Sequence, residues 1–185
     1  MKKVLTILVV LALFAGFAFA DGNTVTLTTK IAKISPTFAL AVKDGDEYKT
    51  TKTVNDITAA DGVTAEFKVS QTSDARVANG AYATLTVTCG EFFLYNENGD
   101  AKVTPNVSTA VPTISSATNA AVGARTNLSY NANAAVVSNV VTFTPKYAGI
   151  VAAGDIGTFS ANWVQRTDLP AGTYKADVTL AYTAL

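Results

Sequence analysis

The residues of this chain that could do chemistry are carboxylates in two short stretches, KDGDEYK (43–49) and FLYNENGDAKV (93–103). The five carboxylates are Asp44, Asp46, Glu47, Glu97 and Asp100. Two carboxylates can serve as acid and base in glycoside hydrolysis. Each stretch, however, carries an Asp-Gly or Asn-Gly pair between strand-like segments, which is typical of a solvated hairpin turn. We therefore expect two hairpins and no catalytic residue.

The same turns are the best candidates for a metal site, because DGDE and NENGD place hard oxygen ligands near a glycine. Neither has the alternating acidic loop that ends in a bidentate Glu. The chain has no His and one Cys, which removes serine triads, His-based metal sites and thiolate zinc sites. We expect no metal, no cofactor and no enzymatic activity.

The single Cys and the single Trp both share the phase of core residues. Cys89 alternates in step with Leu85 and Val87, so we expect a small buried residue, and it has no partner for an internal disulfide. Trp163 is in step with Phe159, which favours a core role over a stacking platform for sugars.

The start of the chain is typical of a secretory signal. Lys2 and Lys3 precede an apolar run over 4–19, and Ala18-Phe19-Ala20 matches the small-x-small cleavage pattern. The run is shorter than the roughly 20 residues that a spanning helix needs. We expect residues 1–20 to be removed, leaving an exported chain without a membrane span.

Charge argues against two classes of partner. The chain has 14 basic and 14 acidic residues, and loss of Lys2 and Lys3 would leave 12 basic against 14 acidic, a net charge of −2. Such a balance supplies no electrostatic field for nucleic acid or for an anionic membrane surface.

Alternation of apolar and polar residues dominates the rest of the chain. It predicts strands over 63–70, 82–89, 157–164 and 173–184. The composition of segment 104–136, rich in Ala, Ser, Thr and Asn, predicts a long connection that contains one short strand or helical turn.

Roughly seven to nine short strands without helical periodicity predict an all-β fold. We expect an antiparallel, immunoglobulin-like β-sandwich in a single domain over 21–185. A closed barrel is the main alternative, and an outer-membrane barrel is disfavoured because the outward positions are polar.

Residues 21–34, DGNTVTLTTKIAKI, are called the N-terminal segment below. Val25, Leu27 and Ile31 share one parity with Thr29, and the other parity is taken by Thr24, Thr26, Thr28 and Lys30. Such a segment can be the first strand of its own sandwich, which the pattern alone favours. It can also lay an apolar edge into a groove of another chain while its amides pair alongside.

Two stretches resemble a known family. NTVTLTTKIAKISPTFALAVKDG, directly after the signal, and LPAGTYKADVTLAYTAL together resemble major pilins of the alternate chaperone–usher pathway, the alpha-type colonisation-factor fimbriae. Shared features are an N-terminal strand ending near a proline, an Asp-Gly turn, and a last strand introduced by Ala-Gly-x-Tyr. Residues 50–155 carry no such resemblance.

The resemblance implies donor-strand exchange, in which an incomplete sandwich is completed by the N-terminal strand of a neighbouring copy. A periplasmic chaperone and an outer-membrane usher would be transient partners, and the product would be a surface fibre for adhesion. The implied donor positions are Val25, Leu27, Thr29 and Ile31. The implied groove-edge positions are Tyr174, Ala176, Val178, Leu180 and Tyr182. The alternative function is a monomeric exported sandwich that binds a surface or carbohydrate ligand.

Overall fold

The structure, a computed structural model, describes residues 27–54, 56–104 and 107–183. It divides the chain into two units at Ile31, and every strand belongs to the unit that begins at Ala32. The described part contains strands and no helix, so the fold is all-β as the sequence predicted. Accordingly, it holds no helix long and apolar enough to cross a membrane. The predicted signal peptide lies outside the described residues.

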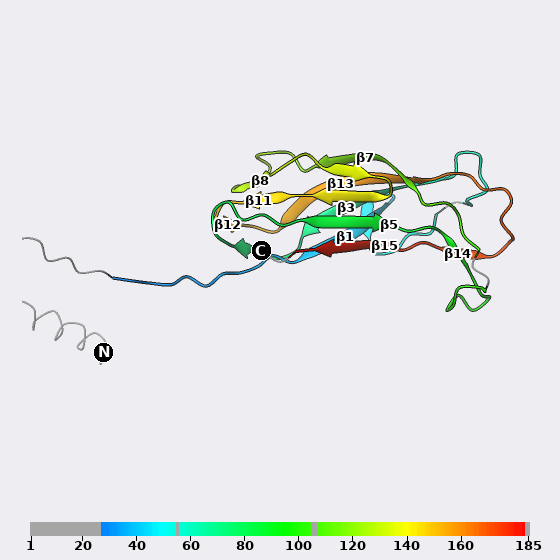
Figure 1. Cartoon of the computed structure of the whole chain (residues 1–185), viewed down its shortest axis with the longest axis horizontal. Coiled ribbons are helices and arrows are strands. Elements are labelled where there is room, and N and C mark those ends of the chain that lie inside the picture. Colours follow the sequence, from blue (N-terminus) through cyan, green and yellow to red (C-terminus); the bar gives the residue numbers. More distant parts are fainter. Residues whose placement is uncertain (1–26, 55, 105–106, 184–185) are drawn as a thin grey trace, which may run out of the picture. The chain divides into compact units, whose positions relative to one another are not determined.

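Two antiparallel sheets form the body of the protein (Figure 1). The five-stranded sheet has the order β2-β1-β3-β13-β7 and consists of β1 (Phe38–Asp44), β2 (Glu47–Lys49), β3 (Val63–Gln71), β7 (Thr113–Asn119) and β13 (Gly154–Trp163). The four-stranded sheet has the order β15-β5-β10-β9 and consists of β5 (Leu85–Cys89), β9 (Ala135–Val137), β10 (Val140–Phe143) and β15 (Val178–Tyr182). Both sheets are open, so the fold is a sandwich and not a closed barrel.

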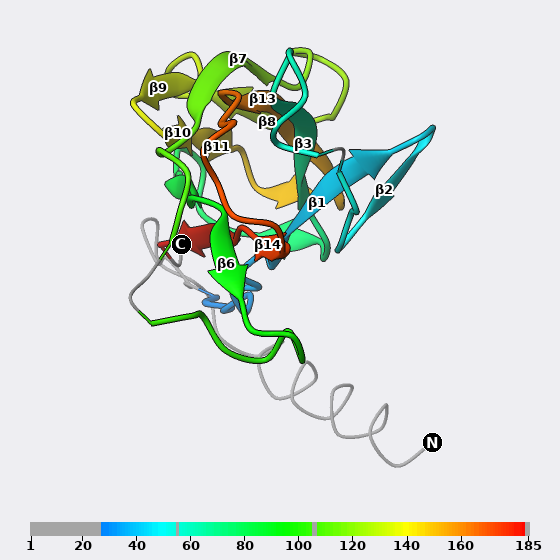
Figure 2. The same ribbon diagram turned by 90° about the vertical axis from the view of Figure 1, so that its right-hand side faces the viewer.

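Three two-stranded ribbons extend these sheets. They pair β4 (Ala75–Arg76) with β12 (Ile150–Val151), β6 (Phe93–Tyr95) with β14 (Thr173–Lys175), and β8 (Leu128–Tyr130) with β11 (Pro145–Tyr147). Figure 2 views the end of the sandwich at which β6 and β14 lie, with the β1–β2 hairpin projecting to one side.

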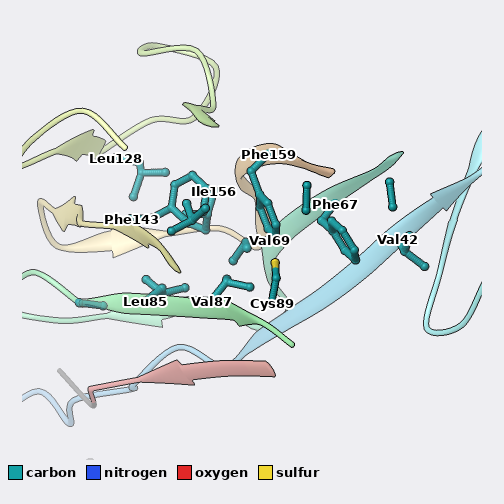
Figure 3. Close-up of a cluster of buried hydrophobic side chains, with 14 of the residues drawn as sticks. Val42, Phe67, Val69, Leu85, Val87, Cys89, Leu128, Phe143, Ile156 and Phe159 are labelled. Atoms are coloured by element: carbon teal, nitrogen blue, oxygen red, sulfur yellow. The ribbon is translucent and has the colours of Figure 1, made fainter. Parts of the chain in front are cut away.

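The core lies between the sheets, because the inward positions of both are apolar. Along β3, every second residue from Val63 to Gln71 is buried, as the alternation predicts. Phe67 stacks on Phe159 of β13 with ring centroids 4.9 Å apart. In Figure 3, Cys89 points from the opposing sheet into this cluster, and it is fully buried as predicted.

A bulge in β13 brings two consecutive residues inward. The register with β3 shifts between Asp155 and Gly157, so that Ile156 and Gly157 are both buried. A Cβ on Gly157 would lie 2.4 Å from Cε1 of Phe143 and 2.6 Å from the carbonyl oxygen of Thr118. Only glycine fits here, and beyond it Phe159 and Trp163 return to the core face, as the sequence indicated.

Both predicted hairpins are present. Gly45 takes a positive φ of 63° as the first of two loop residues between Asp44 and Glu47, as a type II′ turn requires. In the second hairpin, Asn96 donates its backbone N–H to Ala101, and Gly99 has a φ of 71°.

Other boundaries differ from the prediction. The strand expected at 82–89 begins at Leu85, and that expected at 157–164 extends back to Gly154. The strand expected over 173–184 is two strands, β14 and β15, separated by Ala176 and Asp177. It breaks because the halves pair with different partners, β6 and β5, which are themselves interrupted by a three-residue connection.

The prediction for 104–136 was wrong. This segment supplies β7, β8 and most of β9, and β7 is the seven-residue partner of β13. Apart from Ile114 and Ala117, the side chains of β7 are small and polar on both faces, so the apolar contrast that reveals a strand is weak. Pairing with the long β13, and inward contacts of Ile114 and Ala117, hold it in place.

Candidate functional site

A groove of about 1010 Å³ lies between β1 of the five-stranded sheet and β15 of the four-stranded sheet, and it continues along β14 of the adjoining ribbon; we call it the edge groove. Its apolar lining comes from both sheets and from the loops at one end. The main apolar side chains are Leu40, Val42, Val54, Ile57, Val63, Phe67, Phe92, Trp163, Leu169, Val178 and Leu180. Several of these belong to the hydrophobic core, so the groove opens the core at this side of the sandwich.

Trp163 forms part of the lining and is held rigidly. Its Nε1 donates a hydrogen bond of 2.9 Å to the carbonyl oxygen of Gly90. The ring of Phe92 packs edge-on against the Trp163 ring, with centroids 5.2 Å apart. The residue is 2% exposed, which suits a packed wall and leaves no face for stacking a sugar.

One wall of the edge groove is the free edge of β15. Asp177 accepts the backbone N–H of Gly90, and Thr183 donates its own to Thr84, so odd-numbered residues of β15 bond to β5. In an antiparallel pair the alternate residues point their amides the other way. Val178 and Leu180 therefore direct their N–H and C=O groups outward from the sheet edge.

The opposite wall of the edge groove, formed by β1, also has a strand edge that directs backbone N–H and C=O groups outward. Thr72 donates its backbone N–H to Thr37, so the odd-numbered residues of β1 bond to β3. Phe38 and Leu40 consequently direct their amides away from β3, and β2 pairs only with Val42 to Asp44. Among the described residues, the edge groove is thus flanked on both sides by strand edges whose outward N–H and C=O groups pair with no other strand.

An aromatic contact joins the two edges at one end. The rings of Phe38 and Tyr182 meet edge-on with centroids 4.9 Å apart. Neither residue lines the groove, which begins beyond their contact and extends toward β14. At that far end the lining includes exposed loop residues of 50–53 and 170–172, so the groove is accessible from there.

The structure brings most of the predicted groove-edge residues together. Tyr174, Ala176, Val178 and Leu180 line the edge groove and are partly buried. Tyr182 instead lies at the closed end, against Phe38.

The predicted donor residues lie in the N-terminal segment, of which the structure describes only part. Val25 is outside the described residues. Leu27, Thr29 and Ile31 belong to no strand and are exposed, Leu27 at 93% and Ile31 at 71%. The strand pattern over this segment is therefore not realised in the described residues of a single chain; Ile34 alone forms an isolated bridge, with Arg76.

Three of the five candidate carboxylates form side-chain contacts within their own turns. Asp44 and Glu47 approach Nζ of Lys49 at 3.0 and 3.8 Å, and Asp100 accepts a hydrogen bond from Asn96. In the described part of the chain, no three His, Cys, Asp or Glu side chains are grouped so as to hold a metal ion.

Sequence reasoning missed the loop residues of the edge groove. Ile57 and Leu169 stand alone among polar neighbours, so no alternation marks them. The only signal was a large apolar side chain inside a turn-like stretch. Comparisons with protein-family models, with curated proteins and with solved structures gave no match to this chain.

Proposed function

We propose that this protein is the structural subunit of a surface fibre of pilin type, assembled by donor-strand exchange. In this assembly the N-terminal segment of one copy fills the edge groove of the next. The observation that carries the proposal is the edge groove itself, an apolar opening between two strand edges whose amides are unused, in a chain that exposes Leu27 and Ile31.

An inserted strand suits both walls chemically. Free edges beside an exposed apolar surface promote aggregation unless another strand covers them. A strand added there would pair its amides with Leu40 on one side and Leu180 on the other, and would place alternate side chains over the core. The apolar parity of Leu27 and Ile31 meets that requirement.

The lengths also agree. The groove wall from Ala176 to Leu180 and the donor positions from Leu27 to Ile31 each correspond to about 17 Å of extended chain, at roughly 3.3 Å per residue. One N-terminal segment is therefore long enough to cover the β15 wall of one groove.

The attachment of the segment favours chains over closed pairs. The polypeptide enters β1 at Phe38, at the closed end, whereas the accessible end of the groove lies near β14. Donor and acceptor sites thus lie at opposite ends of the sandwich, and a contact between different surfaces repeats head to tail.

Export, the chaperone and the usher belong to the same proposal. The signal-like residues 1–20 would direct export, and an empty edge groove would need temporary cover until a neighbouring copy arrives. Supply of that cover by a periplasmic chaperone, and ordered addition at an outer-membrane usher, follow from the resemblance of the two termini to pilins.

Deletion of Asp21 to Lys33 tests the proposal. The shortened chain should keep its β-sandwich spectrum and lose the ability to form polymers. Addition of a synthetic peptide with the sequence 21–34 should raise its melting temperature. If the full mature chain stays strictly monomeric at high concentration and the deletion unfolds it, the segment belongs to its own sandwich. The monomeric binding module would then be the better account.

A further inference from the structure

We infer that Asp177 fixes the register of the inserted strand by pairing with Lys30 of the neighbouring copy. The inference rests on the proposed function and adds to it the residue pair that decides how far the N-terminal segment enters the edge groove. An alternating strand can fill a groove in several registers that differ by two residues, so something besides parity must choose among them.

The direction of the inserted strand follows from the two ends of the groove. The body of the donor copy follows Ile31, and it must remain outside at the accessible end because Phe38 and Tyr182 close the other. The inserted segment therefore runs from the closed end to the accessible end. Since β15 runs from Val178 to Tyr182 toward the closed end, the two strands are antiparallel.

Asp177 stands in the right place to select a register. The carbonyl oxygen of Asp177 accepts a hydrogen bond of 2.8 Å from the backbone nitrogen of Gly90, which continues the pairing of β5 with β15. The approach is close, because a Cβ on Gly90 would lie 2.8 Å from the same oxygen. Asp177 is exposed, has the parity of the outward-facing Thr179, and forms no ion pair among the described residues. It is an acid fixed at the rim of the groove.

Only one of these registers places a basic residue opposite the Asp177 carboxylate. With Lys30 opposite Asp177, Thr28 lies opposite Thr179, and a cross-strand ion pair forms on the outer face. A shift of two residues toward the accessible end places Lys30 opposite Lys175, where like charges repel. A shift the other way places Lys30 opposite the uncharged Thr179.

The inward residues fit the same register. Leu27 then lies opposite Leu180 and Ile31 opposite Ala176, which is the smallest residue of that wall between Tyr174 and Leu180. In the shifted register, Ile31 would face the bulky Tyr174. Size and charge therefore favour the same alignment.

Cysteine cross-linking reads the register directly. Two full-length variants are made in a Cys89→Ala background. Both carry Thr179→Cys, one with Thr28→Cys and the other with Thr26→Cys, and both are oxidised after export. In the proposed register the Cα atoms of positions 28 and 179 lie about 4.5 Å apart, within disulfide range, and those of 26 and 179 lie beyond it. We expect a ladder of disulfide-linked oligomers with Thr28→Cys and a much weaker one with Thr26→Cys. A ladder with Thr26→Cys alone overturns the register and leaves the proposed function standing.

Charge exchange tests the role of Asp177. Asp177→Lys in the Thr28→Cys chain should lower the cross-linked fraction by roughly two- to five-fold, and Lys30→Asp added to it should restore the fraction. Rescue by the exchange separates register from a general loss of folding. An unchanged cross-linked fraction in Asp177→Lys overturns the inference. Polymers absent from every variant, or a cross-link within one chain, overturn the proposed function and the inference together.

Discussion

Phe38 and Tyr182 lie on edge strands of different sheets, and their rings meet at 68° with centroids 4.9 Å apart. The contact holds the free edges of β1 and β15 together at one end, and the edge groove opens beyond it. A sandwich closed at one end and open at the other accepts a strand from one direction only.

Phe38→Ala should therefore loosen the junction of the two sheets. We expect a loss of about 1 to 3 kcal/mol in the free energy of unfolding, since a partly buried ring and an aromatic pair are both removed. Urea denaturation of the chain measures it. Tyr182→Phe, which keeps the ring, is the control and should unfold at the same urea concentration. A Phe38→Ala protein that unfolds at the same urea concentration as the unchanged chain would contradict a stabilising role of the ring contact.

Leu27→Asp should block assembly and spare the subunit. The inserted strand would bury a carboxylate without a partner, at a cost of several kcal/mol. Thr26→Asp, of the opposite parity, should assemble normally. Polymer yield is compared with the thermal melt of the chaperone-held subunit, or of a subunit complemented by a linked donor strand. Loss of folding in a monomeric Leu27→Asp preparation would show that the segment belongs to its own core.

Stability should fall with rising pH in the alkaline range, and Cys89 should account for part of the fall. Burial raises the pKa of its thiol from 9.0 to about 12. Between these values the unfolded chain loses a proton that the folded chain keeps, so unfolding becomes more favourable, by at most about 1.4 kcal/mol per pH unit for one group. Burial raises the pKa of Tyr130 and Tyr147 in the same direction.

Cys89→Ala is the matched control for that titration. It should cost on the order of 1 kcal/mol at pH 8 because the side chain is fully buried, and it should flatten the decline between pH 8 and 10.5. Urea denaturation at the two pH values gives both quantities. An identical pH dependence in the two proteins would mean that the thiol ionises in the folded state.

Arg125→Met should destabilise the sandwich without touching the groove. The guanidinium donates to the carbonyl oxygens of Ala152, Gly154 and Asp155 and, at 2.9 Å, to Oε1 of Gln71. Tyr147 also donates to that oxygen. Loss of this network should cost about 2 to 4 kcal/mol, because partly buried acceptors lose their partner.

The control for that change is Arg166→Met, which breaks an exposed ion pair with Asp168. It should leave the melting temperature unchanged, since exposed pairs contribute little. Both variants should still assemble once folded. A stable Arg125→Met protein would mean that solvent replaces the guanidinium among these carbonyls.

The local pattern of the sequence determined the strands and their faces. Phe67, Cys89, Phe159 and Trp163 could be assigned to the core because alternate residues of a strand lie on one face, whatever the strand pairs with. The same rule marked Val178 and Leu180 as inward-facing. Gly45 indicated the first hairpin because few residues other than glycine accept its positive φ.

Tertiary structure alone decided which strands pair and where they stop pairing. The break at Ala176 and Asp177 depends on the length of the connection between β5 and β6, which no pattern within 173–184 contains. β7 forms because it can pair with the edge of β13, although its own side chains show little contrast between apolar and polar faces. The edge groove is likewise a property of two strands far apart in the chain. Whether an edge is free depends on the absence of a neighbour, and a sequence does not encode that locally.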